Sequence, residues 1–149
     1  MKRIVFIGLA VIFMLISLLA VNCGNDSLES LEGNIKWTET TLPFSCTYDP
    51  PPTGYVNPDG DYKVAVGGQL ENIANGKVSV FSAIFRLYNS ADEVVGEKVF
   101  NLVESGEPRE LVSNQHTNIG FEQNYTEEIV RYDVLVTDSD GNEYLCVRN

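Results

Sequence analysis

The sequence is poor in the residues from which many enzymes build active sites. It has one histidine, His116, in 149 residues, so this side chain would have to serve any Ser-His-Asp or Cys-His arrangement. His116 lies in a polar segment, residues 114–118, with no G-x-S-x-G motif beside it, and the glycine pairs lack the spacing of a phosphate-binding loop. The sequence therefore predicts a protein without catalytic residues or a cofactor.

Positive charge is also scarce. Ten Lys and Arg residues stand against 21 Asp and Glu. Lys2 and Arg3 precede an N-terminal apolar run and every acidic residue follows Cys23, so the chain beyond Cys23 has a net charge of about −13. Such a surface argues against binding to nucleic acid and against docking on anionic lipid headgroups. It suits solubility outside a cell, with a basic partner or bound cations as the alternative.

The long hydrophobic run lies at the N-terminus. Residues 4–21 contain no charged residue and follow two cations, which is the order of a secretory signal peptide. At about 18 residues the run is longer than the usual apolar region of a signal and reaches the lower limit of a membrane-spanning helix. Its length leaves both a cleaved signal and a retained anchor open.

Cys23 closes this run, and small or polar residues follow it. A cysteine in this place resembles the lipobox of prokaryotic lipoproteins, in which the thiol is acylated and becomes the mature N-terminus. Asn22 and Ala20 differ from the residues that the lipobox favours there. The resemblance implies a signal peptide at residues 1–22, lipidation at Cys23, and a domain held at the cell envelope outside the cytoplasm. The alternative is a membrane-end cysteine without lipid.

Two other cysteines, Cys46 and Cys146, then remain as a pair. Export places them where disulfides persist, so the sequence predicts a Cys46–Cys146 disulfide that closes a loop of about 100 residues. Two cysteines and one distant histidine do not make the tetrahedral ligand set of zinc.

The organisation beyond Cys23 follows from strand and turn patterns, since the helical period is missing after residue 22. Residues 23–33 are small, polar and acidic and are expected to form a tether, and residues 34–149 are expected to form one domain. Strands are expected at residues 34–46, 62–73, 78–88, 93–103, 109–116, 130–137 and 143–147. About seven short strands separated by Gly, Asn, Asp and Pro predict an all-β fold, a β-sandwich.

The segment from about residue 62 to residue 137 resembles the FxLYD domain, an immunoglobulin-like module of prokaryotic extracytoplasmic proteins. The resemblance is carried by F-R-L-Y-N at residues 85–89, by G-Q-L-E-N at residues 68–72 and by S-G-E at residues 105–107. Asn replaces the last Asp of the first motif, and Ser replaces the Pro of the third. The resemblance implies an immunoglobulin-like β-sandwich and no catalytic residues.

Alternation in the third expected strand identifies candidate core residues. Side chains that share one face of this strand are expected to fill the space between two sheets: Phe81, Ala83, Phe85 and Leu87.

Two acidic turns are the candidates for a metal site. Asp59 and Asp61 form one group, and Asp138, Asp140 and Asn142 form the other, with the hard oxygen ligands that calcium prefers. Turns between strands also select Asp and Asn for backbone reasons, which is the simpler interpretation.

These observations predict a non-enzymatic extracytoplasmic lipoprotein that presents a binding or assembly domain at the cell envelope. Its partners would be the membrane, through the N-terminal lipid, and an envelope protein. Tyr48 and Tyr55, beside the prolines at residues 50–52, are the candidate contacts for such a protein. A secreted enzyme or inhibitor that uses loops at one end of the sandwich, and a calcium-stabilised structural module, remain as alternatives.

Overall fold

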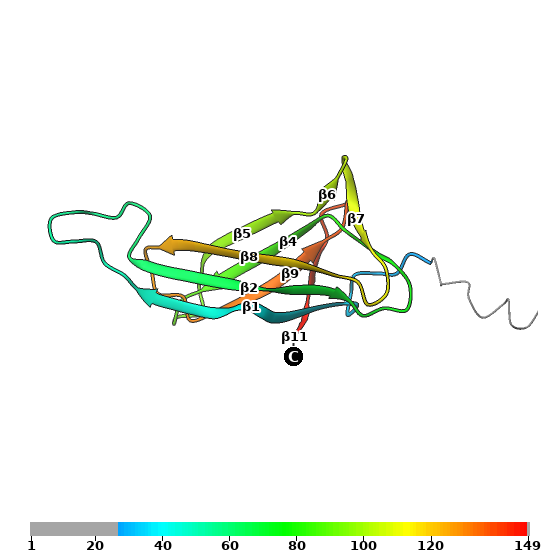
Figure 1. Cartoon of the computed structure of the whole chain (residues 1–149), viewed down its shortest axis with the longest axis horizontal. Helices are drawn as coiled ribbons and strands as arrows, with labels where there is room; N and C mark the ends of the chain where they lie inside the picture. Colours follow the sequence, from blue (N-terminus) through cyan, green and yellow to red (C-terminus); the bar gives the residue numbers. More distant parts are fainter. Residues whose placement is uncertain (1–26, 149) are drawn as a thin grey trace, which may run out of the picture.

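A computed structural model gives the fold of the chain and describes residues 27–148 (Figure 1). The expected signal peptide at residues 1–22 and the lipidation site Cys23 lie outside these residues. The described residues form strands and turns and no helix, which confirms the all-β prediction. Accordingly, they contain no helix of the length and apolar character needed to cross a membrane.

The described residues form eleven strands. Seven of them have five or more residues: β1 (Ile35–Tyr48), β2 (Tyr62–Asn72), β4 (Ser82–Tyr88), β5 (Val94–Asn101), β7 (Glu107–Leu111), β8 (His116–Tyr125) and β9 (Arg131–Thr137). Four are shorter: β3 (Val78–Val80), β6 (Val103–Glu104), β10 (Glu143–Leu145) and β11 (Val147–Arg148). The number of longer strands agrees with the expected number of about seven.

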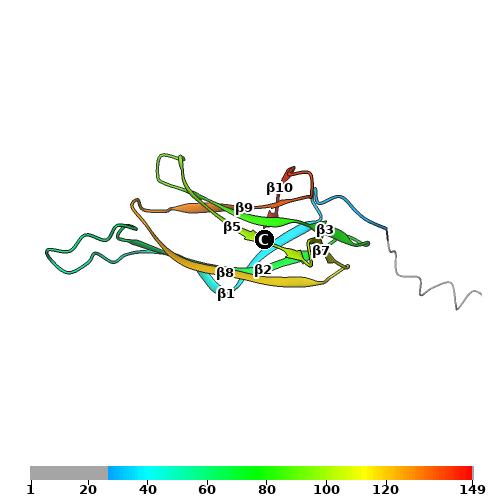
Figure 2. The same cartoon turned by 90° about the horizontal axis from the view of Figure 1, so that it is seen from above.

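The strands form two four-stranded sheets and one small three-stranded sheet. The large sheets have the orders β11-β1-β2-β8 and β10-β9-β4-β5, and the small sheet has the order β3-β7-β6. Figure 2 shows the two large sheets as two layers. In an immunoglobulin-like domain strands A, B and E share one sheet, and strands G, F and C share the other. The strands β1, β2 and β8 and the strands β10, β9 and β4 take these places, so the immunoglobulin-like sandwich is confirmed.

Phe85 of β4 lies at the centre of the core between the two sheets. Its ring is fully buried. The centroid of this ring lies 5.1 Å from that of Trp37 of β1 and 5.4 Å from that of Phe121 of β8, and both pairs meet edge to face. Phe100 of β5 and Tyr132 of β9 lie within 6 Å of the same ring. Edge-to-face contacts add about 0.5–1.5 kcal/mol each beyond the burial of their area. Phe85 therefore joins strands of both sheets.

Two of the expected strands are divided in the structure. The segment 78–88 forms β3 and β4, and the segment 93–103 forms β5 and β6, because each half pairs in a different sheet. Phe81 lies at the first division. Its side chain is 38% exposed, so it does not join Ala83, Phe85 and Leu87 in the core as expected. Local alternation predicts which residues can be buried, but it does not show where a strand changes sheets.

The sequence did not predict a strand at residues 117–125, which form β8 after its first residue, His116. It pairs with β2 over ten residues, from Tyr62 opposite Tyr125 to Glu71 opposite His116. Its inward residues include Thr117 and Ile119, but Gly and polar residues weaken the hydrophobic alternation. The long partner strand β2, which is buried at most positions, supplies the pairing that the sequence of β8 alone does not indicate.

The domain begins earlier than residue 34. Residues 27–29 lie beside Lys77, whose backbone N–H donates to Ser27 O at 3.0 Å and whose carbonyl accepts from Glu29 N at 2.7 Å. Leu31 is 5% exposed and belongs to the core. Residues 27–33, which were expected to belong to a tether, therefore pack on the sandwich, and the expected boundary is corrected.

Asn72 joins three segments at this end of the sandwich. Its side chain is fully buried and donates to Gly76 O and to Leu111 O, both at 2.8 Å, and its Oδ1 accepts from Ala74 N at 2.8 Å. Its backbone N–H donates to Gln115 O at 2.9 Å. Asn72 closes the motif G-Q-L-E-N, and the structure gives it the role of connecting the β2–β3 turn to β7 and β8.

We expect Asn72→Ala to lower the free energy of unfolding by about 3 kcal/mol, because three buried backbone groups lose their partners. Urea unfolding monitored by circular dichroism measures this change. Asn118→Ala, at an exposed position of β8, is the matched control and should change stability by less than about 0.5 kcal/mol. Equal stability of the two variants would contradict the role of Asn72.

Candidate functional site

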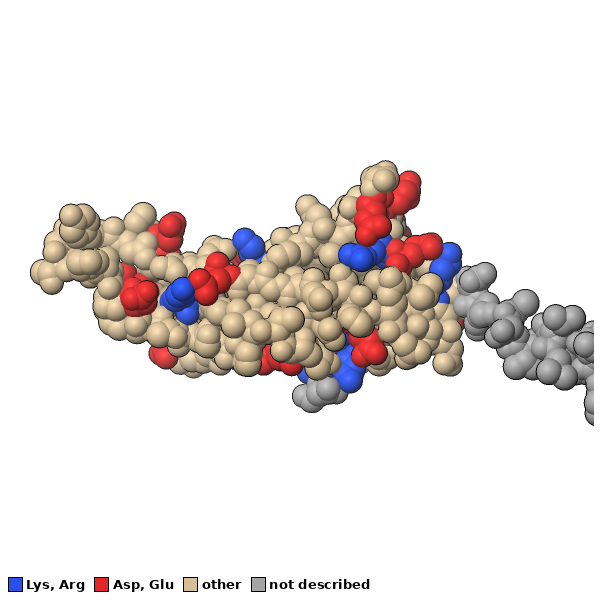
Figure 3. All heavy atoms as spheres, in the orientation of Figure 1, with Lys and Arg blue, Asp and Glu red and all other residues tan. Residues whose placement is uncertain are grey.

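The loop between β1 and β2, which we call the distal loop (residues 49–61), extends from one end of the sandwich. Figure 1 shows it at the opposite end of the molecule from residues 27–34. Its residues 50–58 contain no charged side chain, and acidic residues stand on both sides of this stretch, Asp49 before it and Asp59 and Asp61 after it. Figure 3 shows the same loop as an uncharged projection with acidic side chains behind it.

Large apolar side chains are exposed in and beside the distal loop. Tyr55 is 75% exposed, Val56 is 89% exposed, and Tyr48 at the end of β1 is 61% exposed. The prediction that Tyr48 and Tyr55 are exposed beside the prolines is confirmed. Aromatic residues are enriched where proteins bind other proteins, whereas single exposed apolar residues are ordinary. The distal loop is therefore the candidate binding element.

Hydrogen bonds and a contact between two rings hold the base of the distal loop. At its base Asp49 N donates to Asp61 O at 2.7 Å, and the rings of Tyr48 and Tyr62 lie 5.2 Å apart. Asn124 of β8 donates from Nδ2 to Gly60 O at 3.1 Å. Gly60 has a φ of +103°, and a Cβ there would lie 2.0 Å from the backbone of Tyr125. Only glycine suits this close approach.

A shallow hollow of about 520 Å³ lies within the distal loop. It is lined mainly by the prolines, Tyr55 and Val56, with Asp49, Asn57 and Asn124 as its polar groups. Proline fixes its backbone angle and loses little entropy when a partner binds, so such a surface presents apolar contacts at low cost. The hollow suits an apolar group of a partner with a cation near Asp49.

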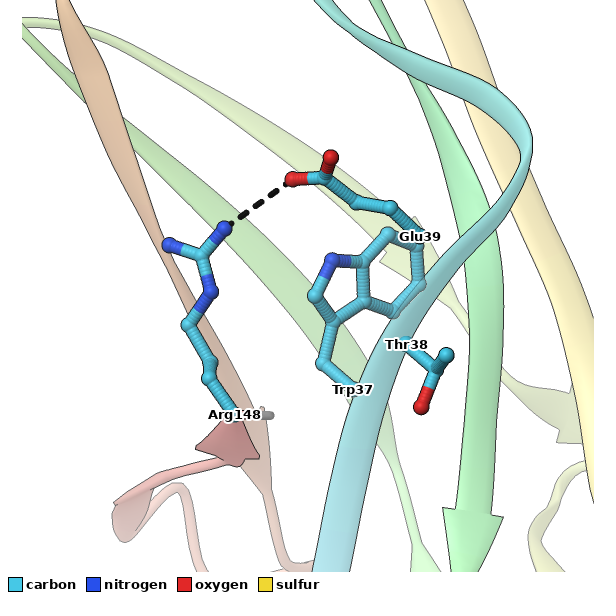
Figure 4. A pocket seen from close by; sticks show the side chains of 4 residues that line it. All are labelled: Trp37, Thr38, Glu39 and Arg148. Carbon is cyan, nitrogen blue, oxygen red and sulfur yellow. Dashed lines mark hydrogen bonds and ion pairs between the residues drawn. The ribbon is translucent and has the colours of Figure 1, made fainter.

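A second hollow lies at the C-terminal strand and is lined by Trp37, Thr38, Glu39 and Arg148 (Figure 4). Arg148 of β11 donates from Nη2 to Glu39 Oε1 of β1 at 3.1 Å and from Nη1 to Tyr132 O at 2.7 Å. Trp37 Nε1 donates to the hydroxyl of Tyr132 at 2.9 Å, and this hydroxyl donates to Glu39. These hydrogen bonds anchor β11 on β1.

Burial, and then the hydrogen bond to Glu39, raise the pKa of Tyr132 above its ordinary value of 10.0. The folded state therefore holds this proton more tightly than the unfolded chain. The resulting stability is present below pH 10 and is lost as the pH rises further.

The two cysteines of the domain are free thiols, and the predicted disulfide is not present. Cys146 follows β10 and donates from its backbone to Val134 O, whereas Cys46 lies towards the far end of β1 and its Sγ accepts from Ile129 N at 3.4 Å. The neighbour of Cys146, Val147, pairs with Lys36, ten residues before Cys46 on β1. Because β1 contains two bulges, this separation of ten residues corresponds to seven along β2, from Glu71 to Val64, which span about 23 Å, whereas bridged Cα atoms lie within about 7 Å.

The acidic turn after β9 is organised by its own hydrogen bonds. Asp138 Oδ1 accepts from the backbone of Asp140 and Asn142 at 2.9 Å, and Oδ2 accepts from Asn142 Nδ2 and Tyr144 Oη. These bonds, that of the Asn142 side chain first, lower the pKa of Asp138. Within residues 27–148, no group of three or more His, Cys, Asp or Glu side chains is placed to hold a metal ion.

The remaining candidate residues are not brought together. Asp59 and Asp61 lie at the distal loop, and Asp138 and Asp140 lie beside Ser30 and Leu31 near the other end. His116 is exposed at the start of β8, opposite Glu71 of β2. The hollows at the distal loop and at Arg148 are lined by other residues.

Neither a family model nor a curated protein matches this chain. Solved structures that align with this chain include the following two. One, the X-ray structure of a structural-genomics target named SoR45, aligns with a TM-score of 0.44 and 11% identity, over 79% of this chain and 84% of that chain. The other, the yjhA protein from Bacillus subtilis, aligns with a TM-score of 0.41 and 18% identity, over 80% of this chain and 95% of that chain. The fold assignment rests on the strand order of the chain itself.

Two tyrosines allow a matched test of the polar network. The hydroxyl of Tyr132 has partners, whereas that of Tyr125 is buried and has no partner among the described residues. We expect Tyr132→Phe to lower the free energy of unfolding by about 1–2 kcal/mol and Tyr125→Phe to raise it by about 1 kcal/mol. Urea unfolding of both variants measures the two changes. The same sign for both would contradict the hydrogen-bond assignment.

The two thiols should differ in reactivity. Burial raises the pKa of the Cys146 thiol to about 12, so it stays protonated at pH 8, whereas Cys46 is partly exposed. We expect a thiol reagent to modify Cys46 in the folded protein and Cys146 only after unfolding. Cys46→Ser and Cys146→Ser assign the two reactions. Absence of both thiols in unreduced protein would show that the predicted disulfide forms after all.

Proposed function

We propose that this protein is a non-enzymatic lipoprotein of the cell envelope that binds a protein partner through its distal loop. The observation that carries the proposal is that the N-terminal segment and the distal loop lie at opposite ends of the molecule. The N-terminal segment, residues 27–34, lies at one end, and the exposed distal loop lies at the other (Figure 1). A chain anchored at its N-terminus would hold this loop away from the membrane.

Charge indicates the kind of partner. Six of the eight Lys and Arg residues in the described part of the chain have an acidic partner within 4 Å, and the acidic residues are in large excess. The distal loop presents an uncharged apolar tip with three aspartates at its base. Its complement is an apolar or aromatic groove bordered by Lys or Arg, in the manner of grooves that bind proline-rich segments.

The residues that resemble the FxLYD domain support a scaffold rather than an active site. Phe85 and Leu87 are buried in the core. Arg86 faces outward and pairs with Glu97 and Glu143, and the ring of Tyr88 lies 3.6 Å from the guanidinium of Arg131. These contacts stabilise the sheet β10-β9-β4-β5. We infer that the chain is a module of this kind, which presents its loops to a partner.

The intact mass of the protein extracted from membranes tests the anchor. We expect a chain that starts at Cys23 and carries acyl groups, and we expect Cys23→Ser to release the protein from the membrane fraction. A mass that includes residues 1–22, with Cys23→Ser still in the membrane fraction, would show a retained helix instead of a lipid.

Site-specific photo-crosslinking tests the distal loop. A photoreactive amino acid in place of Tyr55 should give one discrete adduct in intact envelopes, and the same group in place of Val99, an exposed residue of β5, should not. Val56→Ser should reduce the adduct, because it removes apolar contact area, and high salt should reduce it further. An equal yield from both positions would contradict the loop as the binding element.

A further inference from the structure

We propose that the end of the sandwich opposite the distal loop rests on the lipid bilayer through three exposed side chains, Leu28, Ile73 and Val112. This inference rests on the proposed membrane anchor. It adds a second interaction surface and fixes the orientation of the domain on the membrane.

The length of chain before the described residues carries the argument. Ser27 and Glu29 are already hydrogen-bonded to Lys77, so the chain is fixed to the sandwich from residue 27. Three residues lie between Cys23 and Ser27, so the four steps from one Cα to the other span about 14 Å at most. A retained helix over residues 4–21 would leave a similarly short connection. Either anchor therefore keeps this end of the domain within reach of the headgroups.

The segments at this end lie side by side. Lys77 joins the β2–β3 turn to residues 27–29, and Asn114 N donates to Asn72 O at 2.8 Å, which joins the β7–β8 turn to the end of β2. In Figure 1 residues 27–34 and both turns gather at the end of the molecule from which the N-terminal chain leaves. This arrangement places residues 28, 73 and 112 at the same end.

Each of the three side chains is apolar and open to solvent. Leu28 is 64% exposed, Ile73 is 42% exposed and Val112 is 57% exposed. Transfer of such side chains from water into the interfacial region of a bilayer removes apolar surface from water and is favourable. The short connection supplies a high effective concentration, so weak contacts suffice to hold the orientation.

Charge attraction is not the source of this contact. Glu29, Glu71 and Glu110 lie on the same segments. The cations at this end lie beside acidic residues: Lys77 is held by Glu110 at 3.0 Å, Arg109 by Glu104 at 3.4 Å, and Lys36 lies opposite Glu71. An acidic surface is repelled by anionic headgroups. The partner that fits is therefore a bilayer surface rich in zwitterionic lipid.

Tryptophan fluorescence in vesicles tests the inference. The full-length protein, with Val112→Trp or with the matched control Val99→Trp, is reconstituted in phosphatidylcholine vesicles that contain phosphatidylcholine brominated near the headgroup. Val99 is 51% exposed on the outer face of β5, and the native Trp37 is buried in the core of both variants. We expect bromine to quench the emission of Val112→Trp and to leave that of Val99→Trp unchanged.

The outcomes separate the two proposals. Protein that floats with the vesicles while neither variant is quenched, or both equally, overturns the inference and leaves the anchor intact. Protein that does not associate with the vesicles overturns the anchor itself, and the inference with it. Quenching of Val112→Trp that persists in vesicles of any anionic content would overturn the zwitterionic preference.

Discussion

The contact of Phe85 with aromatic rings from both sheets is the interaction on which the rest of the structure depends. Trp37 and Phe121 approach this ring from the sheet of β1, β2 and β8, and Phe100 and Tyr132 lie beside it in its own sheet. Two sheets pack only when large side chains fill the space between them. The aromatic cluster sets this packing, and the loops at the two ends of the sandwich take their positions from it.

The two ends of the sandwich have different chemistry. The distal loop presents Tyr55 and Val56 on a stretch without charge, and hydrogen bonds at Gly60 and Asp49 hold its base. At the other end Asn72 binds two turns together, and residues 27–31 pack beside them. In the proposed anchored protein, the end with Asn72 would face the membrane and the distal loop would face a partner.

Local patterns predicted the elements well where a strand stays in one sheet. β2 and β9 match the expected segments to within one residue. Tyr48 and Tyr55, the candidate contacts beside the prolines, are exposed in the structure. The division of the segment 78–88 and the whole of β8 were missed, since both depend on the partner strand.

The sequence by itself determined the all-β class, the acidic surface and the uncharged proline loop, because each follows from composition or from a period of two along the chain. Only the tertiary structure decided which residues meet. It separated Cys46 from Cys146, placed Leu31 in the core and joined Trp37 to Tyr132 across 95 positions of sequence. The physical reason is that strand partners and sheet order depend on the packing of the whole core around Phe85, which no local pattern encodes.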